Sequence, residues 1–126
     1  MAFQPLKGLP RVKAALANSM QGLRDIWRME EAFRLEAIAT LLSFPLAFLV
    51  ADTLFQGAVL VGSLVFLLIV EVLNSAIEAV VDRIGAERHE LSRIAKDYGS
   101  LAVLLAMGLV AILWAAAVIS AIIGTA

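Results

Sequence analysis

The chain contains 126 residues, of which 62% are hydrophobic and 17% are charged, and its formal net charge is −1 at pH 7. A soluble domain is normally about half apolar and about a quarter charged, so this composition argues against a soluble helical bundle. Cysteine is absent, which excludes disulfide bonds and thiolate metal sites within the chain.

The first predicted element is an amphipathic surface helix over residues 8–28. Apolar residues recur there at intervals of three or four, which places them on one side of a helix. Basic and polar residues occupy the rest of its surface. Such a helix is typical of the lipid headgroup region, with a tryptophan as interfacial anchor. The apolar side consists of Val12, Leu16, Met20, Leu23 and Trp27.

Three long apolar stretches follow the surface helix. Residues 37–51, 53–70 and 98–126 carry no charged side chain, and a helix needs about 20 residues to cross the hydrocarbon core of a membrane. The first two stretches reach this length when their helices include the charged residues at their ends. We therefore predict an all-α membrane protein that forms a single domain, residues 1–126. The predicted transmembrane helices are 33–51, 54–84 and 91–123.

The ten lysine and arginine residues fall into two groups. One group precedes the first span, and the other lies between the second and third spans. With three spans both groups lie on the same side of the membrane, and an excess of basic residues marks the cytoplasmic side. We therefore expect the N-terminus and the second loop in the cytoplasm and the C-terminus in the periplasm.

The second span ends in a polar segment that carries the strongest chemical signal. Three carboxylates and an amide share one side of the helix there. An ionisable residue at the depth of Glu71 is costly and indicates function, although an interhelical charge pair is the alternative. No basic residue lies on the same side, and oxygen ligands favour Mg²⁺ over zinc. This acidic face consists of Glu71, Asn74, Ser75, Glu78 and Asp82.

Further charged residues lie at the same end of the spans. Basic groups beside carboxylates suit a phosphate-bearing ligand that is held through a metal ion. Glu71, at the edge of the apolar stretch, would suit a general base for a lipid hydroxyl. The sequence contains neither a P-loop nor the motifs of protein kinases. The additional charged residues are Glu30, Glu31, Arg34, Glu36, Glu87, His89, Lys96 and Asp97.

Three segments together resemble the signature of the prokaryotic diacylglycerol kinases. They are the stretch from Glu71 to Gly85, the His-Glu-Leu-Ser sequence at 89–92, and the Ala-Lys-Asp sequence at 95–97. Upstream residues match at the family's spacing, so the resemblance covers essentially the whole chain. The upstream matches are Gly22-Leu-Arg24, Trp27, Glu30 and Ala32-Phe-Arg34.

The resemblance implies a homotrimer of three-span chains with shared active sites in the bacterial inner membrane. The implied reaction is ATP-dependent phosphorylation of diacylglycerol to phosphatidic acid with Mg²⁺, by direct in-line transfer. The expected partners are ATP, diacylglycerol and further copies of the chain, with no nucleic acid.

The resemblance also implies roles for individual residues. Glu71 would be the catalytic base, supported by Asn74, Lys96 and Asp97. Asn18 stands where the family has a tyrosine, and it lacks the ring and the hydroxyl group of that residue. The implied metal ligands are Glu30 and Glu78. The implied nucleotide contacts are Arg11, Asn18, Glu30, Glu78, Glu87, His89, Lys96 and Asp97, and the implied lipid contacts are Arg34, Glu71 and Ser100.

Two alternatives remain at this point. The related undecaprenol kinases share the Asn-x-Ala-Ile-Glu-Ala core, whereas the Asn74-Ser75 pair and residues 82–85 resemble the diacylglycerol branch more closely. A non-enzymatic oligomeric membrane protein would bind cations on the same acidic face without turning over ATP.

Overall fold

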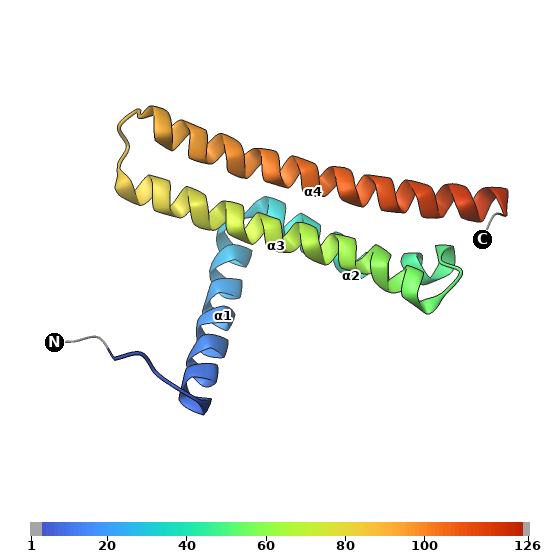
Figure 1. Ribbon diagram of the computed structural model, residues 1–126, viewed down its shortest axis with the longest axis horizontal. Helices are drawn as coiled ribbons and strands as arrows, with labels where there is room; N and C mark the ends of the chain where they lie inside the picture. The colour runs from blue at the N-terminus through green and yellow to red at the C-terminus, as the bar shows by residue number, and fades with distance from the viewer. Residues whose placement is uncertain (1–3, 125–126) are drawn as a thin grey trace. The chain divides into compact units, whose positions relative to one another are not determined.

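The computed structural model describes residues 4–124, and the regular secondary structure in this range is entirely helical. The last three helices are each long and apolar enough to cross a membrane, which confirms the predicted all-α fold with three spans. The chain divides into two compact units, one up to Glu31 and one from Ala32 onward. The four helices, labelled in Figure 1, are α1 (Leu9–Met29), α2 (Glu31–Val50), α3 (Leu54–Ile84) and α4 (Glu90–Ile123).

The first unit contains the amphipathic helix α1. Proline occupies its first turn, where the missing N–H costs no helical hydrogen bond. None of its residues is buried, and the apolar side predicted from the sequence is exposed along its whole length. The helix therefore has the two contrasting sides that a membrane interface requires.

The turn between α2 and α3 is closed by reciprocal hydrogen bonds. The Thr53 hydroxyl accepts from the Gln56 backbone N–H at 3.1 Å, and the Gln56 side chain accepts from the Asp52 backbone N–H at 3.0 Å. This capping arrangement satisfies backbone donors at the start of α3. A Cβ atom on Gly57 would overlap the Phe48 ring, so glycine allows the two helices to approach closely here.

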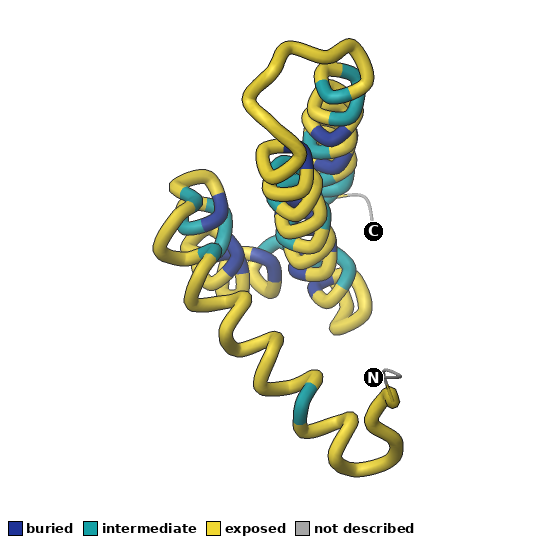
Figure 2. Tube along the Cα trace, turned by 90° about the vertical axis from the view of Figure 1, so that its left-hand side faces the viewer, coloured by how far each residue is buried: buried dark blue, intermediate teal, exposed yellow. Residues whose placement is uncertain are grey.

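Helices α3 and α4 run side by side and are joined by the short loop at one end of the hairpin (Figure 1). A small core lies toward the other end of the hairpin. Most other residues are exposed, as the yellow parts of the tube in Figure 2 show. Exposed apolar side chains on these spans are suited to contact with lipid or with other helices. The core consists of Ala47, Leu60 and Val61, packed against Ala51, Leu113, Trp114 and Ala117.

A hydrogen bond from Trp114 links α4 to α3 within this core. Its indole N–H donates to the Leu60 carbonyl at 3.2 Å. We expect Trp114→Phe to lower the free energy of unfolding by about 0.5–2 kcal/mol, because it removes this bond and part of the packed ring. Thermal unfolding in detergent would measure the change. Leu105→Val, at an exposed position of the same helix, is the control, and equal stability of both variants would contradict the assignment.

Candidate active site

The acidic face occupies the C-terminal half of α3, and its burial decreases along the helix. Glu71 is only 9% exposed. Asn74 and Glu78, one and two turns further on, are half-buried, and Asp82 near the end of the helix is exposed. The face therefore runs from an enclosed carboxyl group inside the span to an open one at its end.

Glu36 of α2 lies beside Glu71, although it was not among the predicted site residues. The two carboxyl groups are close enough to interact electrostatically and to share a hydrogen bond. One carboxylate oxygen of Glu36, Oε2, is buried and has no hydrogen-bond partner within the described chain. Two carboxylates side by side in an apolar region repel one another unless a proton or a cation lies between them. A proton or a cation between Glu36 and Glu71 would remove this repulsion.

Asn74 connects the acidic face to α4. Its side-chain N–H donates to Glu78 Oε1 at 3.4 Å. Its oxygen is buried and, within residues 4–124, accepts no hydrogen bond. That oxygen lies directly against Gly99, where an added Cβ atom would overlap it. Buried acceptors normally have partners, so the unpaired oxygens of Asn74 and Glu36 point to a ligand, a water or another chain at this place.

Ion pairs hold the charged residues at the start of α4. Lys96 Nζ lies 2.8 Å from Asp82 Oδ1, and Arg93 contacts both Glu90 and Asp97, the latter at 2.6 Å. The sequence shows no basic residue on the acidic face itself, but α4 brings one to it. Asp82 is therefore paired, unlike the unpaired acid that the sequence pattern indicated, and is a weak candidate for a metal ligand.

Under the loop between α3 and α4 lies an open cavity of about 350 Å³, and several charged side chains line it. It brings together three residues that the sequence predicted as nucleotide contacts: Glu87, His89 and Lys96. His89 also caps α4, because its Nδ1 atom accepts from the Leu91 backbone N–H at 3.0 Å. The cavity suits a phosphate-bearing group, since several cations surround it. Its other charged lining residues are Asp82, Arg88 and Arg93.

The remaining predicted residues are not gathered at this cavity. Asp97 is engaged with Arg93, Ser100 is exposed on α4, and Arg34 is half-buried on α2. Three others lie in the first unit, so their approach to α3 stays a prediction. These are Arg11 and Asn18 on α1 and Glu30 at its C-terminal cap.

The oxygen atoms of the site suit a magnesium ion, but one chain contributes few ligands. Within residues 4–124, no three acidic or histidine side chains converge as a metal site. Magnesium in phosphate-transferring sites usually takes one or two carboxylates, with phosphates and waters completing its shell. Glu78, steadied by Asn74, fits this pattern as one ligand. The predicted second ligand, Glu30, stays a prediction.

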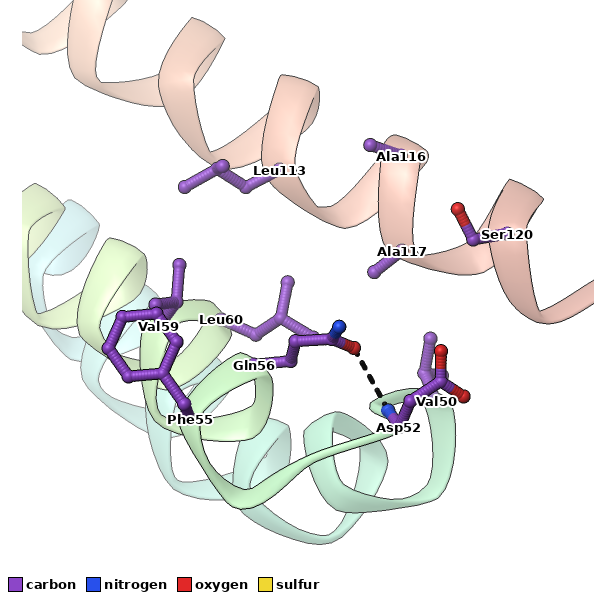
Figure 3. Close-up of a pocket in the computed structure, with 10 residues that line it drawn as sticks. All are labelled: Val50, Asp52, Phe55, Gln56, Val59, Leu60, Leu113, Ala116, Ala117 and Ser120. Atoms are coloured by element: carbon purple, nitrogen blue, oxygen red, sulfur yellow. Dashed lines mark hydrogen bonds between the residues drawn. The ribbon is translucent and has the colours of Figure 1, made fainter. Parts of the chain in front are cut away.

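A second cavity, drawn in Figure 3, lies at the opposite end of α3 and measures about 280 Å³. Its walls are mostly apolar, with Asp52 and Ser120 facing it from the turn and from α4. None of the predicted site residues is among those that line it. The predicted site residues of α3 and α4 therefore lie on or near the acidic face and the cavity under the α3–α4 loop, away from this second cavity.

Comparison with known proteins points in the same direction. Residues 17–118 match the family described as prokaryotic diacylglycerol kinase. The diacylglycerol kinase of Escherichia coli (strain K12) is 48% identical over 107 residues, covering 85% of this chain and 88% of that protein. The diacylglycerol kinase of Haemophilus influenzae is 41% identical, covering 85% and 91%. That of Pseudomonas aeruginosa is 40% identical over 113 residues, covering 90% and 92%.

Proposed function

The chain belongs to the prokaryotic diacylglycerol kinase family and is a membrane lipid kinase, and from this premise we propose that it transfers the γ-phosphate of ATP to diacylglycerol. The products would be phosphatidic acid and ADP. The observation that carries the proposal is the graded burial of the acidic face. A carboxyl group deep in the span can reach a lipid hydroxyl, while polar groups nearer the end of α3 can reach a water-soluble nucleotide.

Glu71 is the proposed general base. It would accept the proton of the lipid hydroxyl as that oxygen forms a bond to the γ-phosphorus, while the bond between the γ-phosphorus and the bridging oxygen breaks. Its burial in α3 supports this role, because diacylglycerol keeps its chains in the membrane and presents only its hydroxyl at that depth. The carboxyl group of Glu36, beside Glu71, would be the second member of the acid pair.

Lys96 and Asn74 would prepare the phosphate end of the site. Lys96 would place a positive charge near the transferring phosphate, and Asn74 would keep the Glu78 carboxylate in position. Mg²⁺, when bound, would neutralise charge on the phosphate oxygens, and the residues that would hold it are Glu78 and Glu30. The cations under the α3–α4 loop would bind the remaining phosphates.

We place this site on the cytoplasmic side of the bacterial inner membrane. The support is the gathering of basic residues before and at the start of α2, and around the loop between α3 and α4. We further propose a homotrimer, because a single chain leaves Asn74 and Glu78 only half-buried on a mostly apolar span. Neighbouring copies would shield these polar groups from lipid.

The direct test is phosphoryl transfer by the purified protein in mixed micelles. Diacylglycerol and undecaprenol are offered together with ATP, with and without Mg²⁺. We expect label to enter diacylglycerol and to depend on Mg²⁺. Preference for undecaprenol would replace the proposed substrate but keep the reaction class. Transfer to neither lipid, by protein shown to be assembled, would favour a non-enzymatic membrane protein.

Glu36 provides a further test of the acid pair. We expect Glu36→Gln to lower kcat about tenfold, because the amide can no longer share a proton or a cation with Glu71. Stability should stay equal or rise, since the substitution removes repulsion between neighbouring carboxylates. Initial rates and thermal unfolding of the same preparation measure both effects. Asp52→Asn, at an exposed position in the turn after α2, is the control, and equal rates for both variants would remove Glu36 from the site.

A further inference from the structure

The Lys96–Asp82 pair joins two helices at the open end of the acidic face. Lys96 Nζ lies 2.8 Å from Asp82 Oδ1, a residue fourteen positions earlier in the chain. The two ion pairs of Arg93, by contrast, connect residues within α4. The Lys96 pair therefore fixes a side chain of α4 against the end of α3.

This pair contributes little to folding. The two side chains are 45% and 68% exposed, and exposed ion pairs are screened by water and lose much of their gain to side-chain ordering. A role for Asp82 in folding alone would thus be small. The ion pair matters instead because it determines where the Lys96 ammonium group lies.

Asp82 determines the direction of a flexible side chain. Lysine carries its charge on a four-carbon stem with many rotamers. The ion pair keeps the Lys96 ammonium at the acidic face, where it also lies within electrostatic range of Glu78. Glu78 in turn is hydrogen-bonded to Asn74. The cation is thus held one turn of α3 away from the carboxylate that is the candidate metal ligand.

We propose that Asp82 is a positioning residue for Lys96. It holds the ammonium beside Glu78 before the nucleotide binds, so that the positive charge is already in place when the phosphate is transferred. Asp82 itself does not touch the reacting atoms. This inference rests on the proposed phosphoryl transfer and adds the residue that orients its cation.

The test compares Asp82→Asn, Asp82→Glu and Lys96→Met with the wild type in mixed micelles. We expect Asp82→Asn to lower kcat about fivefold, the most that ordering by an exposed ion pair can supply, with the KM for ATP changed by less than about twofold. Asp82→Glu keeps a carboxylate that can reach Lys96, so it should recover at least about a third of the activity. In the Asp82→Asn, Lys96→Met double variant the rate should equal that of Lys96→Met alone, because the aspartate acts through the lysine.

Stability and a matched substitution separate positioning from folding. Asp82→Asn should melt at the wild-type temperature, and Asp52→Asn, at the other end of α3, should leave kcat unchanged. Where the wild type transfers phosphate, full activity of Asp82→Asn would overturn the positioning role and leave the proposed function intact. The same holds if the losses of the two single variants multiply in the double variant. It also holds if the loss of activity comes with a lowered melting temperature. A wild-type protein that transfers no phosphate would overturn the proposed function as well.

Discussion

Glu71→Gln is expected to reduce kcat for diacylglycerol phosphorylation roughly 1,000-fold. The substitution keeps the size and hydrogen-bonding shape of the side chain but removes the group that accepts the hydroxyl proton, and a positioned base contributes about 10²–10⁴-fold. The KM for ATP should change little, because Glu71 lies at the buried end of the acidic face, away from the cavity under the α3–α4 loop. Steady-state rates with ATP and diacylglycerol varied independently measure both constants.

The control separates loss of the base from loss of structure. Removing a carboxylate from an apolar region lowers its desolvation cost, so Glu71→Gln should fold and assemble at least as well as the wild type. Asp52→Asn changes a carboxylate at the opposite end of α3 and should keep full activity. If Glu71→Gln, correctly assembled, retained more than about a tenth of the wild-type rate, the neighbouring Glu36 would be the better candidate for the base.

The helices could be predicted from the sequence because each depends on local properties. The predicted spans 33–51, 54–84 and 91–123 differ from α2, α3 and α4 by no more than two residues at either end. Long uncharged stretches determine where a helix can sit in a membrane, and capping groups such as Thr53 mark where it starts. The acidic face followed from helical periodicity alone.

Contacts between helices could not be predicted in the same way. The sequence placed Glu36 among the charged residues at the end of the spans, but its position beside Glu71 depends on how α2 packs against α3. Likewise, the acidic face looked unpaired because Lys96 comes from α4. One helical sequence specifies which residues share a side, but the depth and rotation of its neighbour decide which residues meet across the interface.

Gly99 of α4 makes a contact with Asn74 of α3 that the sequence could not predict. As an isolated glycine in a long helix it carries no sequence signal, since Gly108 occurs in the same helix and has open space around it. Only the packing of α3 on α4 shows that the Asn74 oxygen occupies the space that a side chain at position 99 would need. The position thus links helix packing to the geometry of the acidic face.

Gly99→Ala is expected to lower kcat about 10- to 100-fold while changing stability little. The new methyl group would overlap the Asn74 oxygen, so the amide must swing away and release Glu78, to which it is hydrogen-bonded. Small displacements of positioning groups can cost about 100-fold in rate. The side chain can move without opening the helix, and alanine favours a helix over glycine by up to about 1 kcal/mol, so unfolding should not become easier. Rates and thermal melting of the same detergent preparation test both statements.

Gly108→Ala makes the same chemical change on the same helix without a neighbour to displace. It should keep wild-type activity and match or exceed wild-type stability, because it gains only helix propensity. If both alanine variants kept full activity, the amide of Asn74 would have no part in the reaction. If Gly99→Ala lost activity and stability together, the glycine would serve the packing of α3 on α4. Loss of rate at Gly99 alone, with stability kept, would tie the Asn74–Glu78 hydrogen bond to catalysis.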